Sequence, residues 1–283
     1  MSPDVGELDE QALQRALDAD PDETLALLAD LTGATDPKLR ELARRSAGRL
    51  FLDLSRRGPA RPRGVGRLAT QRYRPDGGDL DIDASMDALL AARSAQIGVD
   101  ADELRIRSWS TPGTAICLLV DRSGSMGGGP LATSAVAAAS VAWRAPDDYS
   151  VLSFGKDVVA AKSQGVAKSN EGVVDAVLAL RGFGTTDVVG ALRAAHDQLA
   201  RSSAGRKVAI LLSDCRATAH GNGHDESVAS VATAARLLDE LVIVAPASHD
   251  EVAQELARIT GCRITTVTGP SDAVAALGRV LDR

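Results

Sequence analysis

Hydrophobic and polar positions alternate through the second half of the chain in runs that are typical of strands and helices. Apolar, strand-like runs occur at 104–109, 114–120, 149–154, 208–212, 241–245 and 263–267. Between most of them lie Ala-rich helical stretches at 131–144, 170–180, 187–202, 225–238, 249–259 and 271–281. This alternation predicts an α/β fold, a doubly wound and mostly parallel six-stranded sheet that helices cover on both faces.

The first two runs are predicted to pair differently from the rest. Only Ser110-Thr111-Pro112-Gly113 separates 104–109 from 114–120, and this is too short for a crossover helix. We therefore expect the two strands to pair antiparallel, which makes 104–109 the one antiparallel edge strand.

The part of the chain before this domain divides into two. Residues 1–55 are predicted to be an α-helical N-terminal region, because Asp20-Pro21 and Asp36-Pro37 each offer an N-cap followed by a first-turn proline. Residues 56–102 are predicted to be an Arg-rich connector and an acidic helical lead-in, and 103–283 are predicted to be the α/β domain. The Arg-rich part of the connector contains Arg56, Arg57, Arg61, Arg63, Arg67, Arg72 and Arg74. A solvated linker is the favoured interpretation of this basic run, and an electrostatic docking surface is the alternative.

Composition excludes several functions. Aromatic residues make up 2% of the chain and the formal net charge is -6, which argues against binding nucleic acid. Cys117, Cys215 and Cys262 form no disulfide or zinc pattern, and Cys117 is expected to be a buried thiol. The acidic N-terminus has no apolar signal segment and no run is long enough to span a bilayer, so we expect a cytoplasmic protein without membrane contact.

The residues that suggest chemistry follow the strand at 114–120. Asp121, Ser123 and Ser125 occupy alternate positions of a tight turn and present three oxygens to one point. Oxygen ligands suit a hard divalent cation such as Mg²⁺. Ligands of open α/β sheets bind beyond the carboxyl ends of the strands, where this turn is expected to lie.

Two further loops are expected to reach the same edge. Thr185-Thr186-Asp187 opens the helix at 187–202, and Ser213-Asp214 ends the strand at 208–212. Together they would add one hydroxyl and one carboxylate. The alternative, a turn whose Asp and Ser merely cap the next helix, is less favoured once these loops are included.

These segments in order, DRSGSM, GTTD and LLSD, resemble the von Willebrand factor A (VWA) family with its metal-ion-dependent adhesion site. The resemblance covers about 103–283, and adjacent Thr185 leaves the threonine register open by one residue. The family's ligand pattern corresponds here to Asp121, Ser123, Ser125, Thr186 and Asp214.

The chemistry of such a site points to binding. If the three hydroxyls contact the cation directly, Asp121 and Asp214 act mainly through water or by orienting them, and the ion stays electrophilic. We then expect it to accept an Asp or Glu of a partner protein, with Mg²⁺ favoured and Mn²⁺ and Ca²⁺ as alternatives. Ser125 does not fit G-x-S-x-G, and we expect no enzymatic activity.

The resemblance also implies a partner. The chain resembles intracellular VWA proteins that are partners of AAA+ ATPases, notably of the MoxR group. The segment GGDLDIDASMDALL also resembles the lead-in of such ATPase-associated proteins. A subunit of a Mg/Co-chelatase-like complex is the alternative, disfavoured by the short preceding region and the basic connector. An extracellular adhesion module is disfavoured by the missing signal segment. His220 and His224 could bind a second metal, but an exposed loop is favoured.

Overall fold

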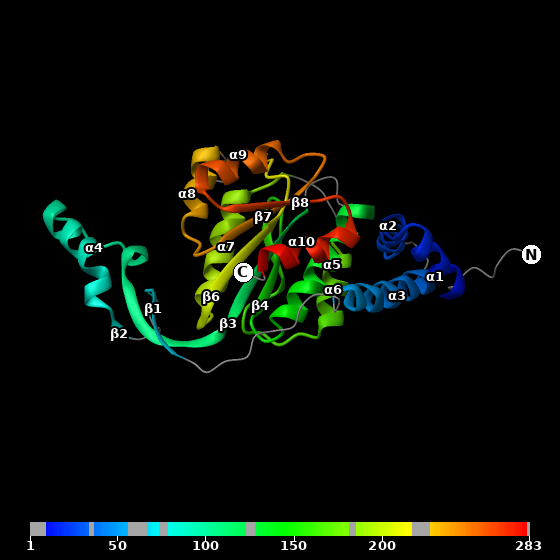
Figure 1. The fold of residues 1–283 in the computed structure, drawn as a ribbon, viewed down its shortest axis with the longest axis horizontal. Coiled ribbons are helices and arrows are strands. Elements are labelled where there is room, and N and C mark those ends of the chain that lie inside the picture. The colour runs from blue at the N-terminus through cyan, green and yellow to red at the C-terminus, as the bar shows by residue number, and fades with distance from the viewer. Residues whose placement is uncertain are drawn as a thin grey trace, which may run out of the picture.

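A computed structural model describes residues 10–33, 37–55, 67–73, 79–122, 128–180, 185–216 and 227–281. At its centre lies a twisted sheet with the strand order β5-β4-β3-β6-β7-β8 (Figure 1). All neighbours pair parallel except β5, which pairs antiparallel with β4. The predicted doubly wound, mostly parallel six-stranded sheet with one antiparallel edge strand is confirmed. The strands are β3 (Arg105–Asp121), β4 (Tyr149–Phe154), β5 (Val158–Lys162), β6 (Ala204–Leu212), β7 (Leu241–Pro246) and β8 (Arg263–Val267).

The identity of the antiparallel edge strand differs from the prediction. Residues 104–109 and 114–120 do not form a hairpin, because both belong to the continuous strand β3, and the edge strand is β5. Pro112 is tolerated because pairing with β6 shifts register between Thr111 and Thr114, and pairing with β4 begins only at Ile116. The missing N–H of the proline therefore removes no bond from either ladder.

The first half of β3 leaves the central sheet and pairs with two short strands. These are β1 (Arg67–Arg72) and β2 (Asp79–Leu80), both antiparallel to it. The predicted solvated linker is thus wrong for 67–72, which form a strand. The other arginines of that run, Arg56, Arg57, Arg61, Arg63 and Arg74, lie outside the described residues.

Helices cover both faces of the sheet, and alternate residues of β3 divide between them. Ile116, Leu118 and Val120 share one core with the first group of helices, and Ala115, Cys117 and Leu119 share the other core with the second. Each predicted helical stretch of the domain contains a helix. The first group is α5 (Gly128–Arg144), α6 (Asn170–Leu178) and α10 (Pro270–Leu281), and the second is α7 (Val188–Ala200), α8 (Val228–Ala235) and α9 (Glu251–Thr260).

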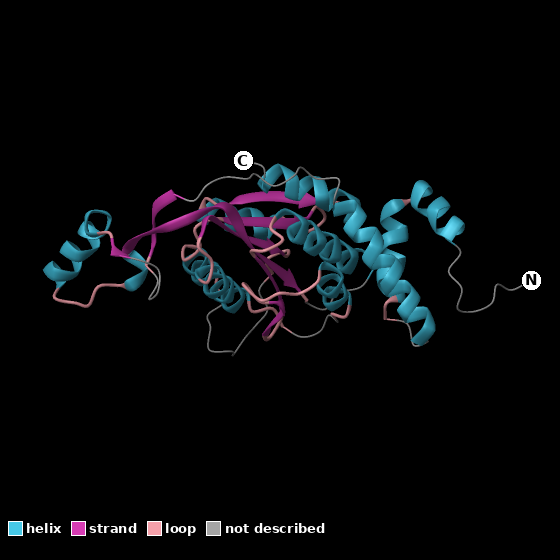
Figure 2. Cartoon of the chain, turned by 90° about the horizontal axis from the view of Figure 1, so that it is seen from below, coloured by secondary structure: helices cyan, strands magenta, loops and turns pink. Residues whose placement is uncertain are grey.

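The N-terminal helices extend the first core. They are α1 (Glu10–Ala19), α2 (Pro21–Leu31) and α3 (Pro37–Ser55), and they lie at one end of the long axis (Figures 1 and 2). Asp20 caps α2 as predicted, accepting from the N–H of Glu23 at 3.0 Å, whereas Asp36 lies outside the described residues. Leu25, Leu28 and Phe51 are buried in the core that contains α5. The helical N-terminal region therefore docks on the α/β domain.

An arm projects from the opposite end of the molecule. It consists of β1, β2, the first half of β3, α4 (Ile82–Ala95) and the short 3₁₀ turn Ala101–Glu103 (Figures 1 and 2). Asp81 caps α4 by accepting from the N–H of Ala84 at 3.1 Å, so the predicted acidic helix start is confirmed. In the described part of the chain, no helix combines the length and the apolar character that crossing a membrane requires.

Candidate metal site at the carboxyl edge of the sheet

The strand order sets where a ligand can bind. From β3 the chain continues through α5 to β4 on one side, while β6 lies on the other side of β3. The loops that follow β3 and β6 therefore diverge to opposite faces, which opens a crevice at the carboxyl edge. Asp121 ends β3 and Ser213-Asp214 follows β6, so both lie at this crevice.

Asp121 is held by a neighbour across the crevice. Its side chain is only 8% exposed, and its Oδ2 accepts a hydrogen bond of 2.6 Å from Ser213 Oγ. Ser213 Oγ in turn accepts from the backbone N–H of Cys215 at 2.9 Å. Because the hydroxyl both donates and accepts, its proton points at the carboxylate and fixes that group's orientation. Ser213 directly precedes the predicted ligand Asp214, but no sequence pattern predicted this supporting role.

Thr186 approaches the same edge from the loop before α7. It is buried, at 1% exposure, and it directly precedes Asp187, the N-cap of α7. The Asp187 N–H donates to the carbonyl of Gly155 at 2.8 Å, and the Arg122 N–H donates to the carbonyl of Phe154 at 2.8 Å. The loop with Thr186 and the end of β3 are thus both tied to the end of β4.

Asp214 lines the same pocket as Asp121 and is half-buried. Burial raises the pKa of the Cys215 thiol, and the carboxylates of Asp214 and Asp121 raise it further, so both act on one buried sulfur. Asp214 Oδ1 also accepts from the backbone N–H of Arg216 at 3.0 Å, while the Arg216 guanidinium lies 3.9 Å from Oδ2. That guanidinium reaches Glu251 as well, at 3.5 Å. Asp214 is therefore oriented by Arg216, a residue that the sequence analysis did not single out.

A pocket of about 820 Å³ opens at this edge. Its walls include Asp121, Asp214 and Arg216, together with the first turn of α5 and the loops after β7 and β8. Asp22 from α2 reaches the same pocket. Ser123 and Ser125, and also His220 and His224, lie outside the described residues, so their predicted roles stay predictions.

The donors at this edge fit a hard cation. Asp121, Thr186 and Asp214 offer oxygen atoms only, which Mg²⁺ prefers. Within the described ranges, no group of three or more His, Cys, Asp or Glu side chains is arranged to hold a metal ion. The predicted pattern would add hydroxyl oxygens to these carboxylates.

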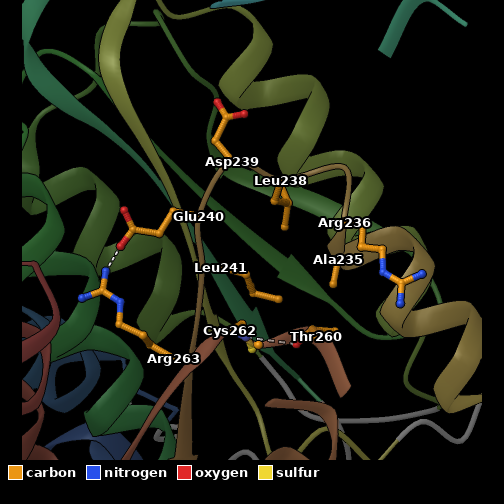
Figure 3. A pocket seen from close by; sticks show the side chains of 10 residues that line it. Ala235, Arg236, Leu238, Asp239, Glu240, Leu241, Thr260, Cys262 and Arg263 are labelled. Carbon is orange, nitrogen blue, oxygen red and sulfur yellow. Dashed lines mark hydrogen bonds and ion pairs between the residues drawn. The ribbon is translucent and has the colours of Figure 1, made fainter. Parts of the chain in front are cut away.

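A second, smaller pocket lies at the opposite edge, where β7 and β8 begin, and measures about 250 Å³ (Figure 3). Glu240 at its rim forms an ion pair with Arg263 and a bidentate pair with Arg206, in which both N–O distances are 2.8 Å. These two arginines also donate to the carbonyls of Val280 and Leu281. This cluster fixes the end of α10 to the sheet and has an evident structural role.

The strand order and the oxygen-lined carboxyl edge together define a VWA-type α/β domain. The family model described as "VWA domain containing CoxE-like protein" matches residues 54–268. Because this match covers more than half of the chain, the protein belongs to that family. Comparison with curated protein sequences finds no match.

Solved structures with a similar fold include three of different origin. The von Willebrand factor type A protein from Catenulispora acidiphila is 14% identical with a TM-score of 0.45, over 62% of this chain and 43% of that chain. The conserved hypothetical protein BatB from Bacteroides thetaiotaomicron is 15% identical, with a TM-score of 0.44, over 60% and 97%. Proximal thread matrix protein 1 from the mussel byssus, with a zinc-occupied MIDAS motif, is 16% identical, with a TM-score of 0.45, over 61% and 48%. The chain thus spans less than half the length of the first and third.

Proposed function

We propose that this protein binds a partner protein through a divalent cation, Mg²⁺ by preference, at the carboxyl edge of the sheet. The observation that carries the proposal is the hydrogen bond from Ser213 to the buried carboxylate of Asp121, beside the pocket that Asp214 also lines. A buried carboxylate oriented by a neighbouring hydroxyl is a typical support of a metal site. The residues that would hold the ion are Asp121, Ser123, Ser125, Thr186 and Asp214.

The chain's own residues prepare this edge for an acidic ligand. Ser213 orients Asp121, and Arg216 orients Asp214 while adding a permanent positive charge to the pocket wall. When bound, the cation supplies a strong local positive charge that attracts a carboxylate. The partner is therefore expected to present an Asp or Glu side chain to the pocket.

The same chemistry requires no reaction at the site. Binding a carboxylate needs neither an activated nucleophile nor a general base, so we infer an interaction module without enzymatic activity. Membership of the CoxE-like family supports a MoxR-type AAA+ ATPase as the partner, with this chain as its adaptor. The cytoplasmic location expected from the sequence stays a prediction.

The test is the affinity of the full chain for a purified MoxR-type ATPase from the same organism, in Mg²⁺ and in EDTA. EDTA, Asp121→Ala and Thr186→Ala are each expected to weaken binding about tenfold or more. The control substitutions are Asp197→Ala and Thr233→Ala, because both side chains are exposed on helices away from the edge. They should bind like the unchanged chain. Equal affinity in Mg²⁺ and EDTA would overturn the proposal.

A further inference from the structure

The outward face of α4 on the arm carries an apolar stripe. Ile82, Met86 and Leu90 recur every four residues and are 58%, 40% and 56% exposed. On the same helix Ser85 and Ala92 are buried. The side of α4 that packs against the rest of the arm is therefore not the side that carries the stripe, and the stripe faces solvent.

Polar contacts hold α4 in a defined orientation on β3. Ser85 Oγ accepts from the backbone N–H of Arg105 at 2.9 Å and lies 3.3 Å from its carbonyl oxygen. Asp81, the N-cap, also accepts from Thr70 Oγ1 at 2.9 Å and lies 3.5 Å from the Arg107 guanidinium. The stripe is thus presented by a helix fixed at its first turn to two strands.

The arm concentrates exposed apolar side chains beyond the stripe. In the part of the chain that the structure describes, more than half of the exposed large hydrophobic residues lie on this arm or directly beside α4. Besides the stripe they are Leu68, Tyr73, Leu80, Ile97 and Val99. A gathering of this kind on a projecting element marks a protein interface rather than ordinary surface.

Charge selects the occupant of this surface. Asp83 directly follows Ile82, and Asp87 directly follows Met86, so both carboxylates border the stripe. Arg93 in the last turn is the single basic residue of the helix. Two copies of α4 packed stripe to stripe would bring these carboxylates together, and an anionic membrane would repel them. A protein groove with an apolar floor and a Lys- or Arg-rich rim would accommodate both the apolar stripe and the carboxylates beside it.

We propose that the apolar stripe of α4 docks in such a groove on the same partner that the carboxyl edge binds. This second contact rests on the proposed function for the partner's identity, but not on the cation. The arm and the candidate metal site occupy opposite ends of β3, a strand of 17 residues. At roughly 3.3 Å per residue the strand measures about 50 Å along its length, so one partner engaged at both ends would gain avidity.

The test uses EDTA to remove the cation-dependent contribution. Binding of the full chain to the purified MoxR-type ATPase is measured in EDTA for the unchanged chain and for Met86→Glu and Leu90→Glu. Each variant should weaken binding about tenfold, because an apolar anchor is replaced by a charge. Ala91→Glu adds the same charge at an exposed position off the stripe, and should change affinity less than twofold. The double variant Asp83→Lys and Asp87→Lys should weaken binding most at low salt.

Other outcomes would overturn the inference. Binding in EDTA that is absent, or that both stripe variants leave unchanged, excludes the α4 contact. A dimer in light scattering that Leu90→Glu dissociates would assign the stripe to a second copy, and Leu90-dependent binding to phosphatidylglycerol vesicles would assign it to lipid. Unchanged circular dichroism of the variants shows that α4 is retained. If instead the stripe variants act as expected but Mg²⁺ adds no affinity, the metal-dependent function alone fails.

Discussion

Asp30 of α2 accepts a hydrogen bond of 2.6 Å from the backbone N–H of Gly128, the first residue of α5. Asp22 of the same helix accepts one of 2.8 Å from the N–H of Ser271 at the start of α10. One N-terminal helix therefore supplies capping carboxylates to two helices that begin at the carboxyl edge, where helix N-termini are partially positive. Gly128 follows Ser125 by three positions in the sequence, so this bond holds the residue at which the described chain resumes after the predicted ligands.

Replacing this cap should destabilise the protein. Asp30→Ala removes the acceptor for the Gly128 N–H, and losing an N-terminal cap of this kind typically costs about 1 kcal/mol. Urea denaturation should show this decrease in the free energy of unfolding, and calorimetric titration should show weaker Mg²⁺ binding. Glu103→Ala, an exposed acidic residue on the arm, serves as the control. If Asp30→Ala binds Mg²⁺ normally, α2 supports the fold without influencing the metal segment.

Ser213→Ala should weaken the site and the fold together. The substitution leaves the buried Asp121 carboxylate without this donor, and such losses cost about 1–3 kcal/mol. Ser140→Ala removes an equally buried hydroxyl whose acceptor is the Val136 carbonyl within α5, and should leave Mg²⁺ affinity unchanged. Titration calorimetry of both variants separates the two effects. Equal Mg²⁺ affinities would show that Ser213 does not support the ion.

Two glycines should respond to alanine with opposite signs. At Gly269 an added Cβ would clash with the Asp22 carboxylate, which caps α10, so Gly269→Ala should lower the free energy of unfolding. At Gly48 within α3 an added Cβ meets nothing within 4 Å, so Gly48→Ala should raise it by about 0.5–1 kcal/mol. Thermal and urea denaturation measure both. A stable Gly269→Ala variant would mean that the contact between α2 and α10 is dispensable.

Cys117 should make the protein less stable in alkali. Burial raises the pKa of its thiol from 9.0 to about 12, so above pH 9 the unfolded chain loses a proton that the folded chain retains. The stabilisation is complete below pH 9 and falls by up to about 1.4 kcal/mol per pH unit as the pH rises towards 12. Between pH 8 and 10, Cys117→Ala should lose about 1.4 kcal/mol less than the unchanged chain. Parallel declines in the two proteins would contradict this, since the other thiols contribute equally to both.

Much of the domain follows from local patterns in the sequence. Fully apolar runs such as Ile116–Val120 are typical of central strands, and the Ala-rich stretches between them are typical of covering helices. Asp20 and Asp81 cap their helices as short-range rules predict. Asp121 and Asp214 reach the same edge because parallel strands end there. These features depend on neighbours in the sequence or on the topology alone.

What the sequence did not reveal depends on distant contacts. The strand β5 has only five residues, Val158–Lys162, and it ends in a lysine. This is too short a run for an alternation of apolar and polar positions to be recognised. Pro112 suggested a turn between two strands. The register shift that accommodates this proline within β3 depends on pairing with β6, about ninety residues later, and is therefore not visible in the local sequence. The caps from Asp22 and Asp30 join residues 249 and 98 positions apart, and no local pattern predicts such pairs.

The continuous strand β3 has a mechanical consequence. Its second half is hydrogen-bonded along its length to β4 on one side and β6 on the other, while its first half carries the arm. A pull on the arm along the strand would load these parallel ladders in shear, with many bonds sharing the force, rather than opening them one after another. Force applied to the arm would therefore be transmitted along β3 to Asp121 before the hydrogen bonds of the sheet break.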